Sequence, residues 1–161
     1  MNKIILILLI IVSQFSFAQN EKLTQKKITR LFKEDKNNNY KDWFSCNLDN
    51  TFYKSDTIYL YDNVDYFLED WKCKKFIRFR FNTKKSFSQC EYAFYGSIST
   101  VSEITKKDLY KMKVTTENDS IFINKYFNNE LVVKFYVKEL SEFQLTDAKY
   151  KSKKLILIKI H

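Results

Sequence analysis

The sequence predicts a mainly β domain, in which an antiparallel up-and-down meander of eight or nine strands closes into a barrel. The first observation is alternation: residues 131–137, LVVKFYV, place Val133, Phe135 and Val137 on one face of a strand. This period of two is typical of a strand with one buried face. The second observation is that similar runs follow one another with short polar turns between them, which favours a meander. The third is physical, because closing a long meander into a barrel removes its two exposed edges.

Each predicted strand is a short run rich in aromatic and β-branched residues, as strand propensity favours. In chain order these runs are 42–48, 56–62, 75–81, 86–95, 110–117, 120–126, 131–137, 142–146 and 154–160. The chain has one glycine and no proline, so the Asn and Asp clusters between the runs are expected to form the turns. Residues 96–108 are less patterned and are expected to form a loop over the barrel mouth. A β-sandwich is the alternative architecture.

The N-terminal residues have the three parts of a secretory signal peptide. Lys3 supplies the positive charge, residues 4–12 are apolar, and Ser16 and Ala18 are small residues at the −3 and −1 positions of a cleavage site. The apolar run is shorter than the ~20 residues that span a bilayer. We therefore expect cleavage after Ala18, a secreted or periplasmic location, and one mature domain, residues 19–161, without a transmembrane segment. The alternative for the apolar run is a buried N-terminal strand or helix.

A short amphipathic helix is predicted within residues 20–35. Leu23, Ile28 and Leu31 lie among charged residues at a spacing close to one helical stripe, and Asn20 is a candidate N-cap. We expect this helix to pack on the domain. The alternative is a frayed N-terminal arm.

The chain is basic, with a formal net charge of +9. Its cations are almost all lysines, since Arg30, Arg78 and Arg80 are the only arginines, and acidic residues lie among the lysines. Arginine is the preferred residue for bidentate contacts with phosphates and bases. The composition therefore indicates a solvated surface, and no nucleic-acid partner is expected.

No catalytic, metal or cofactor site is expected. His161 is the one histidine, which leaves no Ser-His-Asp or Cys-His arrangement and too few ligands for zinc. Gly96 is the one glycine, so a glycine-rich phosphate loop is excluded. The carboxylates within residues 62–70 lack calcium-loop spacing and favour a solvated turn. We expect a protein that is not an enzyme.

Three cysteines, Cys46, Cys73 and Cys90, raise the question of a disulfide, which persists in the oxidising compartment that an exported protein meets. A tight hairpin turn would place Ile77 opposite Cys90 and Cys73 roughly 13 Å further along the strand. Because a disulfide needs Cα atoms within about 7 Å, Cys73 reaches Cys90 only if residues 71–75 turn back over the strand. We favour the Cys73–Cys90 disulfide. A pairing with Cys46, or no disulfide at all, stays open.

The predicted helix, an early tryptophan and the closing strands resemble small secreted bacterial lipocalin-like proteins. Trp43 opens the first predicted strand, DWFSC, and residues 134–160 alternate in the manner of the family's last strands, with Leu140 and Ser141 at the position of a Leu-Ser turn. The chain departs from the family at Lys41, where the family has a glycine. The resemblance covers most of the mature chain and implies a lipocalin-like barrel.

Export, the meander pattern and the aromatic content together suggest a non-enzymatic barrel that binds a small apolar ligand. The inward-facing residues expected to line such a cavity are Trp43, Ile77, Phe79, Phe81 and Phe135. The same side chains equally suit a core filled solid, which small barrels usually have. The alternative function is a cell-envelope interaction module that binds protein or polysaccharide through its outer surface.

Arg78 and Arg80 are candidates for an anion clamp. They are two residues apart on one predicted strand, so they share a face about 7 Å apart and, if that face lines the barrel, would hold a carboxylate or phosphate group. The alternative is an outward-facing pair balanced by Glu91 on the neighbouring strand.

Overall fold

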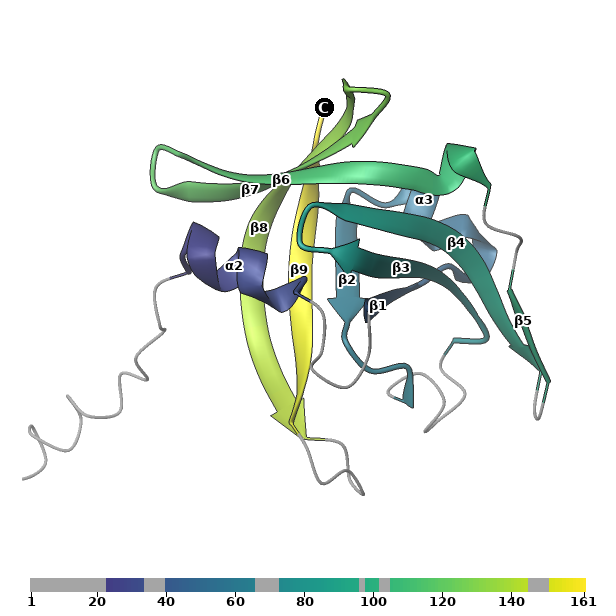
Figure 1. Cartoon of the computed structure of the whole chain (residues 1–161). Helices are drawn as coiled ribbons and strands as arrows, with labels where there is room; N and C mark the ends of the chain where they lie inside the picture. Colours follow the sequence, from purple (N-terminus) through teal and green to yellow (C-terminus); the bar gives the residue numbers. More distant parts are fainter. Residues whose placement is uncertain (1–22, 34–39, 66–72, 96–97, 102–104, 145–150) are drawn as a thin grey trace, which may run out of the picture.

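The computed structural model in Figure 1 shows one β-barrel with short helices at its ends. The structure describes residues 23–33, 40–65, 73–95, 98–101, 105–144 and 151–161. The helices are α2 (Gln25–Leu31), η1 (Leu48–Asn50), α3 (Thr51–Lys54) and η2 (Lys106–Asp108). The strands are β1 (Lys41–Cys46), β2 (Thr57–Tyr61), β3 (Lys75–Thr83), β4 (Ser86–Tyr95), β5 (Ile98–Val101), β6 (Leu109–Glu117), β7 (Ser120–Phe127), β8 (Glu130–Gln144) and β9 (Lys151–Ile160).

The strands form one antiparallel sheet that closes on itself, so the predicted mainly β, closed antiparallel barrel is confirmed. The wall runs in the order β3, β1, β2, β9, β8, β7, β6 and β4, and β4 pairs back with β3. β5 pairs with the second half of β4. Strands that follow one another in sequence are neighbours in the wall with one exception: β1 lies between β2 and β3. β1 therefore pairs with both β2 and β3.

Asn and Asp form the β6–β7 and β7–β8 turns, as the lack of glycine predicts, whereas Lys84 and Lys85 form the β3–β4 turn. Asn118 and Asp119 join β6 to β7 with φ angles of 46° and 62°, and Asn128 and Asn129 join β7 to β8 with φ angles of 50° and 67°. A two-residue hairpin turn with both residues left-handed matches the natural twist of the strands. Asn and Asp adopt this conformation more readily than other residues with a side chain.

Two local predictions are wrong. Residues 131–137 and 142–146 were expected to be separate strands, but β8 runs unbroken from Glu130 to Gln144. A register shift between Val137 and Glu139 lets β8 bend there, so no Leu-Ser turn forms. Part of the expected loop over the mouth is instead β5, which pairs with β4.

The main hydrophobic core fills the inside of the barrel. Its buried members are Ile28, Phe32, Trp43, Phe52, Ile58, Leu60, Ile77, Phe79, Phe81, Phe87, Met112, Val114, Ile121, Ile123, Phe135, Val137, Leu155 and Leu157. Along each strand these residues alternate with side chains on the outer face, as the period of two predicts. Burial of this apolar area is the main source of the fold's stability.

Helix α2 lies against one end of the barrel, below the β6–β7 hairpin in Figure 1. Its N-cap is Thr24, whose hydroxyl accepts a hydrogen bond from the Lys27 amide, while the proposed cap Asn20 lies outside the described residues. Phe32, just after the helix, stacks on Phe81 and packs against Trp43. The predicted packing of an N-terminal helix on the domain is thus seen for residues Gln25–Leu31.

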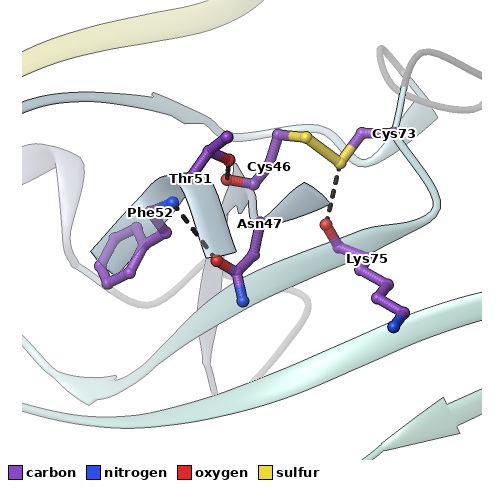
Figure 2. The surroundings of a disulfide bond; sticks show 6 residues. All are labelled: Cys46, Asn47, Thr51, Phe52, Cys73 and Lys75. Atoms are coloured by element: carbon purple, nitrogen blue, oxygen red, sulfur yellow. Dashed lines mark hydrogen bonds between the residues drawn. A yellow bond between two sulfur atoms is a disulfide. The ribbon is translucent and has the colours of Figure 1, made fainter. Parts of the chain in front are cut away.

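The disulfide joins Cys46 to Cys73, with Cα atoms 5.8 Å apart, so the predicted Cys73–Cys90 pairing is wrong. Cys90 is a buried free thiol. The prediction considered only β4 as a neighbour of β3, whereas β1 pairs with the other edge of β3 and brings Cys46 opposite Phe76. Cys73, just before β3, therefore lies beside Cys46 (Figure 2).

The observed β3–β4 register places Cys90 further from Cys73 than the register predicted from the sequence does. An irregularity between Phe81 and Thr83 places Arg78, not Ile77, opposite Cys90. Five residues then separate Cys73 from the position facing Cys90, a distance of roughly 16 Å along an extended strand. That span exceeds the reach of a disulfide.

Candidate functional site

The predicted ligand-lining residues are mostly part of the solid core. Ile77, Phe79 and Phe81 all point into the barrel, where Phe79 packs against both Phe52 and Phe87 at ring-centroid distances of 5.6 Å. The middle of the barrel is therefore occupied by side chains. Trp43 is also a fully buried core residue, at the end of the barrel next to α2.

A pocket of about 450 Å³ lies at the other end of the barrel, which we call the mouth. Its apolar walls include Phe52 from α3, Val133 and Phe135 from β8. Phe135 is thus the predicted lining residue that reaches this pocket. The volume lies within the range of pockets that hold small molecules.

Helix α3 forms one wall of the mouth because hydrogen bonds and the disulfide hold it at the end of β1. The Asn47 side chain accepts a hydrogen bond from the Phe52 amide at 3.3 Å. It lies next to the Cys46–Cys73 disulfide (Figure 2). The Thr51 hydroxyl donates to the Cys46 carbonyl at 3.4 Å. The position of α3 therefore depends on the covalently fixed end of β1.

Lys125 is the unusual residue of the mouth. It follows Ile121 and Ile123 on the inward face of β7, and only 8% of its surface is exposed. Its Nζ donates to Gln89 Oε1 at 2.6 Å and lies 3.6 Å from the centre of the Tyr110 ring. Among the described residues, no carboxylate lies within salt-bridge distance of this ammonium group. Burial lowers the pKa of Lys125 from 10.5 to about 8.

The mouth also contains a second amine, two phenols and the carboxyl groups of Glu91 and Asp108. Lys159 Nζ donates to the carbonyls of Phe52 and Tyr53 at 3.0 and 3.1 Å, which ties α3 to β9. Burial raises the pKa of Tyr53, helped by the nearby Glu91, and burial with the charge of Asp108 raises the pKa of Tyr110. Both phenols therefore stay protonated and available as hydrogen-bond donors at neutral pH.

The candidate clamp residues, Arg78 and Arg80, lie on the outer face of β3, because the inner face is formed by the residues between them. Arg80 makes a bidentate pair with Asp42, at 3.0 and 2.9 Å, which raises its pKa. Arg78 is buried under the Tyr92 ring, 5.6 Å from its centre. The structure thus places neither guanidinium inside the barrel, and the partner of Arg80 is Asp42.

Glu91, the partner proposed for an outward arginine pair, lines the mouth instead. The Asn47 side-chain amide donates to it at 3.5 Å. Within the described part of the chain, no group of three His, Cys, Asp or Glu side chains is arranged to hold a metal ion. None of the helices in that part is long and apolar enough to cross a membrane.

Sequence reasoning missed Lys125, although the pattern contained a signal. In SIFINKYF the buried positions of the alternation are Ile121, Ile123 and Lys125, so a charged residue stands where a core residue is expected. Gln89 and Tyr110 carried no comparable signal, because their proximity to Lys125 depends on β4, β6 and β7 meeting at the mouth.

Comparison with known proteins adds no family to this description: no family model, curated protein or solved structure matches the chain.

Replacing Lys125 with methionine is expected to stabilise the protein at neutral pH. The folded state binds this proton less tightly than the unfolded chain, so stability rises with pH between about 8 and 10.5. Below pH 8 the lysine is charged in both states, so desolvation of the buried ammonium group lowers the free energy of unfolding by its full amount. We expect Lys125→Met to raise the free energy of unfolding by about 2 kcal/mol at pH 7.

Urea denaturation of both proteins at pH 7 and near pH 10 measures this difference. The gain from Lys125→Met should shrink as the pH rises, whereas the control Lys107→Met, at an exposed lysine, should change stability little at either pH. A gain that does not vary with pH contradicts the assignment of the cost to the buried charge.

Proposed function

We propose that the protein is an exported, non-enzymatic, lipocalin-like binding protein that holds a small amphipathic ligand at the barrel mouth. In this proposal the anionic group of the ligand pairs with Lys125, and its apolar part contacts Phe52, Val133 and Phe135. The observation that carries the proposal is the buried ammonium group of Lys125, which has no carboxylate partner among the described residues.

A buried charge without a partner is costly, and side chains that bear such a cost are common at functional sites. An anionic ligand group would supply the missing counter-charge and form a charge-assisted hydrogen bond. The Tyr53 and Tyr110 hydroxyls, which stay protonated, offer further donors to the same group. Lys125 and the two phenols therefore favour a ligand with a carboxylate or similar head over a wholly apolar one, against the opposing charges of Glu91 and Asp108 in the same pocket.

The filled middle of the barrel limits the size of the ligand. Phe79 and Phe87 pack beneath the pocket, so an apolar tail enters only the upper part of the barrel. A pocket of about 450 Å³ suits a short chain or a single ring system. The Cys46–Cys73 disulfide supports export, because disulfides persist in oxidising compartments.

The test compares two ligands of the same shape and different charge. Displacement of the fluorescent probe 8-anilinonaphthalene-1-sulfonate should show that octanoate binds about tenfold more tightly than octanol at pH 7, a difference of about 1.4 kcal/mol. The preference should weaken as the pH rises through about 8, because the free amine no longer attracts the carboxylate.

Lys125→Met should abolish the preference for octanoate, while the exposed control Lys107→Met should keep it. Equal affinity for the two ligands in the wild-type protein, or a preference that survives in Lys125→Met, refutes the assigned role of Lys125. Binding of neither ligand nor the probe refutes the ligand site itself.

A further inference from the structure

A strongly basic groove lies on the side of the barrel, between α2, the β3–β4 turn and β6, and reaches the β7–β8 turn at Asn129. It consists of two adjoining pockets that share Gln25, Thr29 and Lys84. Seven cationic residues line them: Lys26, Arg30, Lys33, Lys84, Lys85, Lys111 and Lys113. No carboxylate of the described residues lines either pocket. The whole chain has 19 acidic residues for 28 cationic ones, so this segregation of charge departs from the rest of the surface.

The two sides of the groove are held on β6 by hydrogen bonds. The Gln25 side-chain amide donates to the Val114 carbonyl at 2.7 Å and fixes α2 on one side. The Met112 amide donates to the Lys85 carbonyl at 2.7 Å and fixes the β3–β4 turn on the other side. The groove is therefore part of the folded framework, and its lysines project from anchored backbone.

The spacing and the floor of the groove indicate the class of ligand. Lys111 and Lys113 are two residues apart on one face of β6, which places their Cα atoms about 7 Å apart. The pocket between them and the β3–β4 turn has a volume of about 750 Å³ and includes Tyr126, Ser86 and Asn129. It thus combines spaced positive charges with an aromatic ring, a hydroxyl and an amide.

We propose that this groove binds an acidic polysaccharide, with the lysines paired to its carboxylate or sulfate groups and Tyr126 packed against a sugar ring. Clustered lysines repel one another, and a polymer with regularly spaced negative charges relieves that repulsion. Lysine acts as a point charge and suits scattered single contacts, whereas bidentate phosphate recognition favours arginine. An aromatic ring presents an apolar face to a sugar while its hydroxyl stays in contact with water.

A lipid bilayer fits this groove less well. Exposed large apolar side chains would insert into a bilayer, and none of those that the described surface exposes lines the groove, although Leu131 pairs with the groove residue Tyr126. Met112 and Val114, the apolar β6 residues at the groove, are buried in the barrel core behind the lysines. The favoured partner is therefore a soluble or cell-wall chain that lies along the groove.

The binding test uses a labelled polygalacturonate oligomer of ten sugars and fluorescence anisotropy at low salt. Replacing Lys84, Lys85, Lys111 and Lys113 together with glutamine should weaken binding at least tenfold. The matched control replaces Lys54, Lys75, Lys106 and Lys107, four exposed lysines of the mouth end, with the same change in net charge. The control should weaken binding less than threefold, and added salt should weaken wild-type binding.

Further measurements separate a polysaccharide site from other anion binding. Tyr126→Leu should weaken polygalacturonate binding several-fold and leave the binding of polyglutamate of equal charge unchanged. Equal losses in the two lysine quadruple variants, or equal affinity for both polymers with no effect of Tyr126→Leu, overturn the proposal. So does binding to phosphatidylglycerol vesicles without binding to polygalacturonate. Lys125→Met should leave polygalacturonate binding unchanged, so this proposal stands or falls independently of the mouth pocket.

Discussion

Replacing Trp43 with alanine is expected to lower the free energy of unfolding by about 4 kcal/mol. The Trp43 side chain is fully buried where α2 meets the barrel. Its ring packs against Phe32 at 5.8 Å, and its indole N–H donates to the Leu31 carbonyl at 3.4 Å. Alanine would leave a large cavity at this end of the core and would leave the Leu31 carbonyl without this donor. Urea denaturation followed by far-UV circular dichroism measures the loss.

Trp43→Phe separates the two contributions. It keeps most of the packed ring and removes the indole donor, so we expect a smaller loss of about 1 to 2 kcal/mol. Tyr59→Ala, at a tyrosine that is 46% exposed on β2, serves as the surface control and should cost much less than Trp43→Ala. A loss from Trp43→Ala no greater than that of the control contradicts a central packing role for Trp43.

Removing the disulfide with the double substitution Cys46→Ser and Cys73→Ser is expected to lower the free energy of unfolding by about 3 to 4 kcal/mol. The two cysteines are 27 positions apart, and the bond restricts the unfolded chain over that loop. Cys73 also belongs to a second buried cluster, with Phe44, Tyr61 and Phe76 on the outer face of the barrel. A hydroxyl placed in this cluster adds a cost of its own.

Dithiothreitol should destabilise the wild-type protein by a similar amount and leave the double variant unchanged. Cys90→Ala, which removes the buried free thiol and keeps the disulfide, should retain the response to dithiothreitol. Mass spectrometry of the oxidised protein should find one disulfide between the peptides that contain Cys46 and Cys73. A disulfide to Cys90, or three free thiols, contradicts the structure.

The local sequence pattern predicted where the strands lie along the chain. It could not predict the order of the strands in the sheet, which depends on pairing between distant segments. Residues 86–95 were expected as a strand and form β4 with the same bounds, because alternation and strand propensity act over a few residues. The place of β1 between β2 and β3 depends on contacts between segments far apart in sequence. The disulfide prediction failed for the same reason, since it is this placement that brings Cys46 to Cys73.

In the candidate site, too, features set by local sequence were predictable and features set by contacts between strands were not. The inward positions Ile77, Phe79 and Phe81 were predicted correctly as one face of a strand, yet whether that face surrounds a cavity or a filled core depends on the volumes of all facing side chains. Lys125 stood out locally as a charge in a buried position. Its neighbours Gln89 and Tyr110 come from other strands, so the shape of the pocket followed only from the closed barrel.

The pairing of β2 with β9 has a consequence for how the chain acquires its structure. Ile58 of β2 pairs with Leu157 of β9, so the ring of strands is completed by segments about 100 positions apart. As the polypeptide is synthesised, β1 to β8 can associate early, but β2 and β8 each keep an unsatisfied backbone edge until β9 fills the gap between them. Folding is thus cooperative to its final step. A chain that lacks β9 exposes the unpaired backbone edges of β2 and β8, which can pair with strands of other molecules.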